Sequence, residues 1–432
     1  MSPVFAVIFR KAHREMIHLG ARYYSLNRLL LLAVGLWPYQ QSKFTQFQFI
    51  FFSAILSAGI IFQLTPLIVL KCTSDLVTKV LSTVSFFTIF IIKYNAFRFN
   101  IEVVKKLLME LQHILNELRD KNEIAIAKKY SCIANRYTIA FTALVVSGIF
   151  VSIIVQFWSN LINIDVPMNI SHQRSRHLFI ITEYFIDQEK YFYLILFHMY
   201  VAFSIGATVM VAIGTMLITY AQHTCGMFRI ASYRIKHAMS IDILQNITLK
   251  NKILMTEGII YAVDIHRQAM KFVFTSTIFV QYLRLIISFC FGRLSKDLLS
   301  AFEIMMFCLI TCGVVCVSIN LFQIFQIASS GNNVEELLFP FMFLFASVMY
   351  MFIANYIGQN VTDHNNYVFS TAYNVQWYRA PIHIQKMILF LLQRKTKEFT
   401  LSVGKLFHAS MECFATLVKT SVSYFTVIYS TR

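Results

Sequence analysis

The sequence predicts an all-α polytopic membrane protein with seven transmembrane helices, and three observations support this fold class. First, 57% of the 432 residues are hydrophobic and 14% are charged, whereas soluble domains average about 45–50% apolar and about 25% charged residues. Second, the apolar residues form several runs that are each long enough to cross a bilayer. Third, Lys and Arg gather in alternate segments between these runs.

A transmembrane helix needs about 20 predominantly apolar residues. Seven stretches meet this requirement: 44–70, 75–97, 133–158, 191–218, 302–328, 335–358 and 402–430. An eighth apolar stretch, 272–292, carries Arg284 near its middle, and a central Arg costs about 2.5–3.5 kcal/mol on insertion scales. We therefore expect this eighth stretch to lie at the membrane surface or to be buried within the protein.

The distribution of basic residues predicts how the chain is oriented. If the N-terminus is cytoplasmic, the inside segments are 1–43, 98–136, 219–301 and 359–401, and they hold most of the 38 Lys and Arg residues. Cytoplasmic loops of membrane proteins are enriched in these residues. We therefore expect a cytoplasmic N-terminus, an extracellular C-terminus, and a glycosylation acceptor at Asn169 in the outer loop 159–190.

Two of the inside segments have a helical pattern. Leu107, Leu111, Ile114 and Leu118 recur at helical spacing among Lys and Glu residues. Pro381 begins a second segment, which runs to Thr396. We expect these extensions to be helices that pack together beneath the membrane.

Enzyme and nucleic-acid functions are poorly supported. The formal net charge is +17, but loops between apolar spans carry it, so the bilayer explains it better than nucleic acid does. The chain has no phosphate-binding glycine loop, dinucleotide-binding pattern, zinc-protease motif or nucleophile elbow. We expect no enzyme activity, no cofactor, no metal site and no nucleic-acid partner. We expect His198 to be a packing residue and Lys93 to reach the membrane interface.

The last span is unusually polar. It contains Glu412 and Lys419 two turns apart, with Thr416, Thr420 and Ser423 on roughly the same side. Intramembrane ionisable groups usually face a bundle interior or water. A polar stripe that ends near Val427 is typical of a water-filled pore with a hydrophobic constriction. A helix held to its neighbours by Ser and Thr hydrogen bonds would look similar, and polarity alone leaves both interpretations open. One helix cannot surround a pore, so a pore would need several subunits.

From residue 373 to the end, the chain resembles the insect odorant receptors, which are subunits of ligand-gated cation channels. The resemblance is carried by Tyr373-Asn374, Trp377-Tyr378, Pro381, the string from Thr400 to Leu406, Glu412-Cys413-Phe414 and the string from Lys419 to Val427. Upstream, Gly35-Leu36-Trp37-Pro38-Tyr39 is similar to the ant, bee and wasp (hymenopteran) members. The seven-span layout with an inside N-terminus agrees with that family along the whole chain.

The resemblance implies an organisation for the whole chain. It consists of a cytoplasmic N-terminus (1–43), a six-helix ligand-binding bundle (44–358) with cytoplasmic extensions (98–132 and 219–301), a cytoplasmic anchor helix (359–401) and a pore-lining helix (402–430). One pore helix would come from each of four subunits in the plasma membrane of a sensory neuron. Val427 would form the narrowest ring, Thr431 would lie one turn further out, and Ser423 and Thr420 would line the inner pore. The partner would be an odorant co-receptor in a heterotetramer, because this chain lacks the long intracellular insertion of that co-receptor.

The resemblance also implies a ligand and its place. The family's odorant pocket lies in the outer half of the bundle among the second, third, fourth and sixth spans, and it takes a small, volatile or cuticular hydrophobic ligand. Such pockets select by shape and dispersion. The candidate residues are Thr83, Phe87, Ser147, Phe150, Val151, Ile154, Phe197, Tyr200, Phe341, Met342 and Phe345.

The chain departs from the family at one place. Family members run almost directly from a segment like 266–272 to one like 297–303, whereas here about 273–294 intervenes. We interpret this stretch as an insertion, which an intron left unspliced in the gene model would explain. The alternatives are a related gustatory-type receptor channel, a metabotropic seven-helix receptor, which has the opposite orientation, and a transporter, for which inverted repeats are expected.

Overall fold

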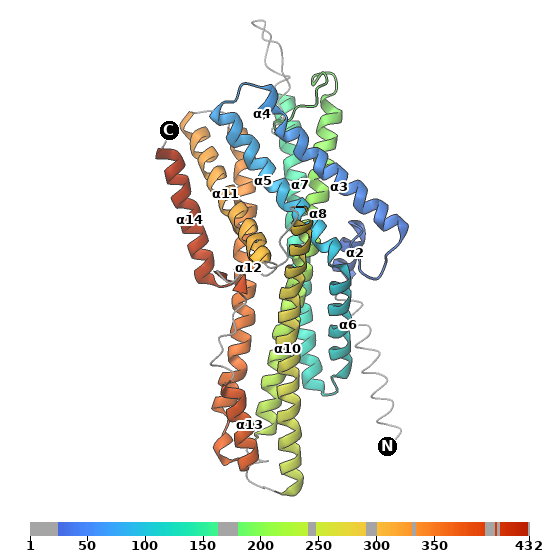
Figure 1. Cartoon of the computed structure of the whole chain (residues 1–432), viewed down its shortest axis with the longest axis vertical. Coiled ribbons are helices and arrows are strands. Elements are labelled where there is room, and N and C mark those ends of the chain that lie inside the picture. Colours follow the sequence, from blue (N-terminus) through green and yellow to red (C-terminus); the bar gives the residue numbers. More distant parts are fainter. Residues whose placement is uncertain are drawn as a thin grey trace.

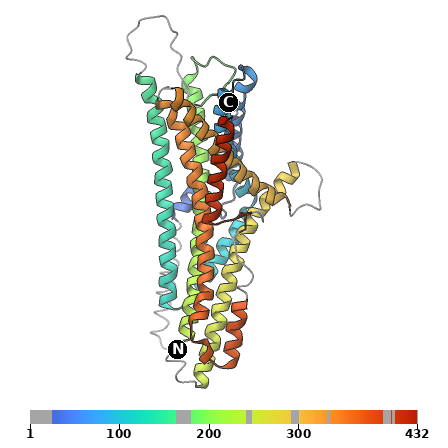
Figure 2. The ribbon, with the colours of Figure 1, turned by 90° about the vertical axis from the view of Figure 1, so that its left-hand side faces the viewer.

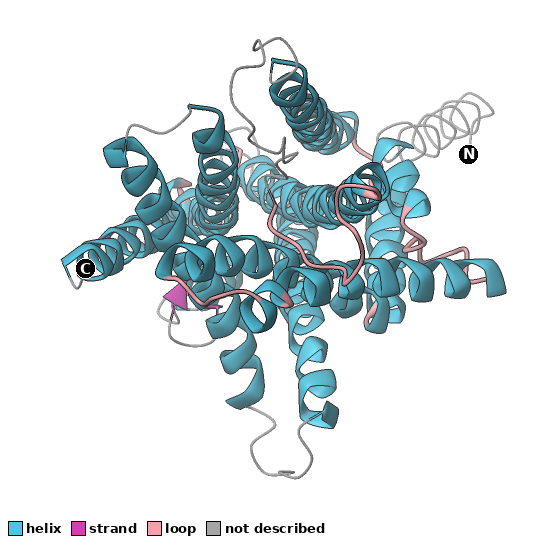
Figure 3. Ribbon diagram, turned by 90° about the horizontal axis from the view of Figure 1, so that it is seen from above, coloured by secondary structure: helices cyan, strands magenta, loops and turns pink. Residues whose placement is uncertain are grey.

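Helices make up nearly all of the structure. The computed structural model describes residues 25–162, 180–240, 248–290, 300–330, 334–393, 402–403 and 407–430. Within these ranges, the strands are a short antiparallel pair of β1 (Ser402–Val403) and β2 (Phe407–His408). Figure 3, seen along the long axis, shows this pair beside the helical bundle. The predicted all-α fold class is therefore confirmed.

The described helices, in chain order, are α2 (Ser25–Ala33), α3 (Lys43–Leu64), α4 (Pro66–Val69), α5 (Ser74–Phe99), α6 (Ile101–Glu117), α7 (Lys121–Ile162), α8 (Phe192–Ala238), α10 (Leu249–Cys290), α11 (Ser300–Ser330), α12 (Val334–Asn374), the 3-10 turn η1 (Trp377–Arg379), α13 (Ile382–Gln393) and α14 (Met411–Ser430).

The helices form two tiers along the long axis of the molecule (Figure 1). The upper tier contains α3, α5, α11, α14 and the adjoining parts of α7, α8 and α12. The lower tier contains α6, α13, most of α10 and the remaining parts of α7, α8 and α12. A helix of 47 residues such as α8 is about 70 Å long at 1.5 Å per residue, which is more than twice the thickness of the bilayer core. Such helices therefore project far beyond the membrane.

Six described helices are long and apolar enough to cross a membrane: Lys43–Val69, Ser74–Phe99, Lys121–Gln156, Phe192–Ala238, Thr311–Ser329 and Leu337–Asn374. They correspond to the first six predicted spans. The seventh prediction corresponds to α14, which has 20 residues but is too polar to qualify by hydropathy. The stretch 272–292 forms no span of its own among the described residues, because α10 continues into it from the lower tier as one helix ending at Cys290.

Local sequence explains where several helices begin. Ser42 and Thr45 form a reciprocal capping box at the start of α3. The Thr73 hydroxyl accepts a hydrogen bond from the Leu76 amide at the start of α5. The predicted helix after Pro381 is confirmed as α13, and the predicted helix near Leu107 is confirmed as α6.

The predicted start of the last span at residue 402 was wrong. The helix begins at Met411, after the β1–β2 pair. The Ser410 hydroxyl accepts from the Cys413 amide and so caps the helix. The Ser410 amide in turn donates to Asn355 Oδ1 of α12. This tertiary contact and the cap together set the start of α14.

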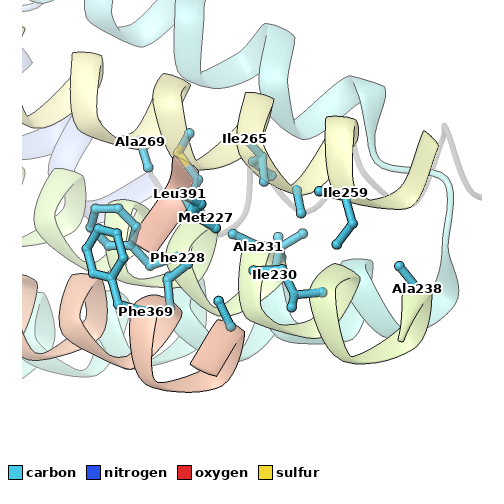
Figure 4. Close-up of a cluster of buried hydrophobic side chains, with 14 of the residues drawn as sticks. Met227, Phe228, Ile230, Ala231, Ala238, Ile259, Ile265, Ala269, Phe369 and Leu391 are labelled. Carbon is cyan, nitrogen blue, oxygen red and sulfur yellow. The ribbon is translucent and has the colours of Figure 1, made fainter. Parts of the chain in front are cut away.

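The lower tier has its own apolar core, where α8, α10, α12 and α13 meet (Figure 4). Phe228 of α8, Ile265 of α10, Phe369 of α12 and Leu391 of α13 are all buried there. An ion pair at its edge joins α7 to α8, because Arg234 donates to both carboxylate oxygens of Glu123 at 2.6 and 2.9 Å. α13 thus packs in this core, whereas Leu107 and Leu111 of α6 belong to the separate cluster around α5 and α8.

The upper core gathers around α8. Phe87, Phe90 and Tyr94 of α5 are almost completely buried against α3 and α8. At Gly206 of α8, a Cβ atom would lie only 2.0 Å from the Phe90 ring. The close approach of α5 and α8 therefore depends on a residue without a side chain.

Candidate functional site

The candidate ligand residues on α5 belong to the buried core. Phe87 has no exposed surface, and its ring lies 6.5 Å from the Phe203 ring of α8. Thr83 is buried one turn away, and its hydroxyl donates to the Val80 carbonyl at 3.0 Å. Phe87 packs against α3 and α8.

The candidates on α7, α8 and α12 are mostly on the surface of the single chain. Phe150, Phe197 and Phe341 are 63%, 67% and 58% exposed. Ser147, Val151, Ile154 and Phe345 are exposed as well, and Met342 is half-buried. The structure therefore does not bring these rings together with Phe87. Figure 2 shows why, because α7 stands along one edge of the bundle.

Near the candidate residues, α7 makes a contact with α8 and another with α12. The Tyr200 hydroxyl of α8 donates to the Ser152 carbonyl of α7 at 2.8 Å. Gly148 of α7 faces the Met342 methyl of α12, which would lie 3.9 Å from a Cβ added at the glycine. Tyr200 and Met342 are therefore the candidates that contact α7 from the neighbouring helices.

A buried polar cluster between α5, α11 and α12 was missed by the sequence analysis. Asn320 Oδ1 accepts from the Ser82 hydroxyl at 2.9 Å, and Asn320 Nδ2 donates to the Cys316 carbonyl at 2.7 Å. The Cys316 sulfur lies 3.4 Å from the Ser347 hydroxyl of α12. An Asn within an apolar span was the available signal, because a buried amide needs partners from other helices.

Lys93 is buried and does not reach the interface, so that expectation was wrong. Its side chain is 8% exposed, and its ammonium lies 3.7 Å from the centre of the Tyr350 ring and contacts the Tyr350 hydroxyl. The ring supplies a cation–π contact, which is strongest where water is excluded. The charge therefore ties α5 to α12 inside the bundle.

The segment before α8 covers the ends of α3 and α8 in the upper tier. Tyr184 stacks on Phe62 with ring centres 4.1 Å apart, and its hydroxyl lies 2.7 Å from His198 Nδ1. His198 thus has the packing role expected of it. Removal from water raises the pKa of Tyr184 to about 12.

Gln63 lies beside this cover and is completely buried. Neither polar atom of its amide has a hydrogen-bond partner among the described residues, and the Thr182 hydroxyl lacks one there as well. Sequence reasoning missed Gln63, although a polar residue near the end of an apolar span was visible. Its buried amide is a polar group near the upper end of the bundle.

A small void lies in the lower tier, away from the ligand candidates. Leu111, Tyr130, Met227 and Ile230 are among the residues that line it. It has room for about one water molecule, which is far too little for an odorant.

α14 lies at the edge of the bundle (Figure 1), and its exposed residues include a polar face. Glu412, Thr416, Lys419 and Ser423 are exposed, and Val427 is 54% exposed. These residues recur every three or four positions and therefore share one helix face. Thr420 is half-buried beside it. Thr431 and Asn169 lie outside the described residues.

The hydroxyl groups on this face do not attach α14 to its own bundle. The Thr416 hydroxyl donates to the Glu412 carbonyl, the Thr420 hydroxyl to Thr416 and the Thr426 hydroxyl to Ser423, all within the helix. Interhelical bonding therefore does not explain the polarity of the exposed face within a single chain.

The comparisons with known proteins agree on one family. A family model described as "7tm Odorant receptor" matches residues 73–422. A Drosophila melanogaster protein, "Putative odorant receptor 69a, isoform A", is 30% identical over 89 residues, which are 21% of this chain and 23% of that protein. "Putative odorant receptor 85d" of the same fly is 23% identical over 98 residues, or 23% of this chain and 24% of that protein. The matched segments thus span about a quarter of each relative.

Solved structures have the same fold over the whole chain. The insect olfactory receptor OR5 from Machilis hrabei in complex with eugenol matches with a TM-score of 0.70 and 13% identity, covering 97% of this chain and 100% of that one. A second structure of that receptor matches with a TM-score of 0.61 and 14% identity, again covering 97% of this chain and 100% of that one. The family match covers most of the chain, and it names a receptor family rather than an enzyme. This chain therefore belongs to the insect odorant receptor family of polytopic membrane proteins.

Proposed function

We propose that this chain is the odorant-binding subunit of a ligand-gated, non-selective cation channel in which α14 lines the pore. The exposed polar face of α14 carries this proposal. Ionisable side chains are costly against lipid, so Glu412 and Lys419 need water or protein partners. A water-filled pore on that side supplies the water.

The pore requires other subunits. A single helix encloses nothing, and the polar face of α14 is exposed rather than packed on its own bundle. Four pore helices around an axis, contributed by this chain and an odorant co-receptor, would place Val427 at the narrowest ring. Ser423 and Thr420 would face the inner pore, and Thr431 would lie beyond the ring. A ring of valines can close such a pore by dewetting.

In this proposal the lower tier is the cytoplasmic anchor and the upper tier lies in the plasma membrane. The basic residues support that orientation, because they gather in the lower tier: Lys105, Lys106, Lys128, Lys129, Arg234, Lys236, Lys250 and Lys252. Lys71 and Lys190 are at the upper end. Cytoplasmic segments carry such an excess.

The ligand is a small hydrophobic odorant that binds in the outer half of the bundle. Its proposed contacts are the candidate residues of α5, α7, α8 and α12 named above. The support is the sparse packing between α7 and α12, which meet near Met342, whereas α7 packs extensively on α8 and bonds to it through Tyr200. Separation of α7 from α12 would admit a ligand toward the buried side of α5. Eugenol, bound by the Machilis hrabei receptor, belongs in a first ligand panel.

The test is whole-cell recording from cells that express this chain with an odorant co-receptor subunit, across an odorant panel. Odorant-evoked current without dependence on G proteins supports the proposal. Val427→Ser should alter ion permeability, because it makes the constriction polar. Val422→Ser makes the same chemical change on another side of α14, where the native residue is 44% exposed, and should leave permeability unchanged. Equal permeability in both variants would refute the pore assignment.

A further inference from the structure

The position of α14 is set mainly by α11. Among the described elements, α14 packs chiefly on α11 and less extensively on α12. Its buried residues are Leu417 and Ser421, and Leu417 packs against Val314 and Val317 of α11. A displacement of α11 would therefore carry α14 with it.

One hydrogen bond fixes how α14 sits along α11. The Ser318 hydroxyl of α11 lies 2.9 Å from the Ser421 carbonyl of α14 and 2.8 Å from the Val314 carbonyl of its own helix. Both serines are almost completely buried. Since a hydroxyl has one proton, the two carbonyls share it. A shift of α14 along α11 would break the contact between the two helices.

The opposite side of α11 is bonded to α5. Asn320 has no exposed surface, and its Oδ1 accepts from the Ser82 hydroxyl. Two successive helical steps turn a side chain by about 200°, so Ser318 and Asn320 point to opposite sides. α11 is thus hydrogen-bonded to α14 on one side and to α5 on the other.

The α5 end of this arrangement lies at the ligand candidates, because Ser82 directly precedes Thr83. We propose that Ser82, Asn320 and Ser318 form a hydrogen-bonded path through which the ligand region sets the position of the pore helix. This inference rests on the proposed function, since it takes α14 as the pore helix. The three residues are positioning residues that act through α14.

The path works because its bonds are costly to break. A buried donor or acceptor that loses its partner bears the full cost of its removal from water, and low dielectric strengthens each bond. When α5 moves on ligand binding, α11 keeps the Asn320–Ser82 bond by moving with it. The Ser318–Ser421 bond then passes the displacement to α14.

The test needs no identified ligand. The full chain with Ser423→Cys is expressed together with an odorant co-receptor subunit, and a charged, water-soluble methanethiosulfonate modifies the introduced cysteine from the aqueous side. The rate of modification is measured, with the chain lacking Ser423→Cys as background. Ser82→Ala and Ser318→Ala should each change that rate by about fivefold, as expected for the loss of one buried hydrogen bond. Asn320→Leu also removes the bond to the Cys316 carbonyl and should change the rate at least as much.

A double variant tests whether Ser82 and Asn320 act together. Ser82→Ala combined with Asn320→Leu should change the rate no more than Asn320→Leu alone, because Asn320→Leu already removes the bond to Ser82. Ser82→Thr and Ser318→Thr keep the hydroxyl and should keep the parent rate. They also remain informative if an alanine variant does not reach the cell surface, which surface biotinylation reports.

Ser329→Ala is the matched control. Ser329 is an exposed residue of the same helix, and its hydroxyl donates to the Phe325 carbonyl of α11 itself. This variant should keep the parent rate. Parent rates in all path variants, or fully additive effects of Ser82→Ala and Asn320→Leu, would overturn the path while leaving the pore intact. If the water-soluble reagent never modifies the cysteine in the chain with Ser423→Cys alone, then α14 does not line a water-filled pore, and the proposed path is refuted as well.

Discussion

At the scale of single residues, Gly206 shows how closely the upper core is packed. A Cβ atom there would lie 2.0 Å from the buried Phe90 ring, so Gly206→Ala forces the ring to move. Overpacking of this kind typically costs about 1–3 kcal/mol. We expect a lower melting temperature for the detergent-solubilised receptor, measured by fluorescence-detected thermal unfolding. Gly214→Ala is the control, because nothing lies within 4 Å of its added Cβ. It should be neutral or slightly stabilising, since alanine favours helix. Equal melting temperatures for both variants would contradict the close α5–α8 approach.

At the scale of elements, α2 is a short helix that packs on α8 through the buried Leu31 and is hydrogen-bonded to it by one side chain. The Asn27 amide donates to the Thr219 hydroxyl at 2.9 Å and accepts from the Thr215 hydroxyl at 2.6 Å. Asn27→Ala leaves both hydroxyl groups without this partner, at a cost of about 1–3 kcal/mol. We expect faster amide hydrogen exchange throughout α2, measured by mass spectrometry. Leu29→Ala removes a side chain that is 62% exposed on the same helix and should leave the exchange unchanged. Slow exchange in the Asn27 variant would mean that other contacts hold α2.

At the scale of the whole molecule, the two tiers predict a single orientation in the membrane. If the lower tier is cytoplasmic, the outer loop 159–190 is exposed to the glycosylation machinery and the loop after α8 is not. Asn169→Gln should therefore abolish the endoglycosidase-sensitive shift in gel mobility, because Asn169-Ile170-Ser171 is an acceptor pattern. Asn246-Ile247-Thr248 matches the same pattern, and Asn246→Gln should change nothing. A glycan attached to Asn246 would show that the chain is inverted.

The sequence by itself determined the helical class, the first six spans and the unusual polarity of the last helix. These properties belong to single segments, because a run of about 20 apolar residues needs a membrane whatever lies beside it. Family membership was equally readable, since the matching strings near Trp377 and Lys419 are contiguous in the chain.

Only the tertiary structure decided which side chains meet. It placed the start of α14 at Met411, where Ser410 contacts Asn355 of another helix, and it buried Lys93 against Tyr350. It also joined Ser82 to Asn320 across 238 positions of sequence. A buried polar group needs a partner, but nothing in the local pattern says which distant helix supplies it. The relative placement of the helices supplies that information, and for this receptor it sets the contacts that connect α5 to α14.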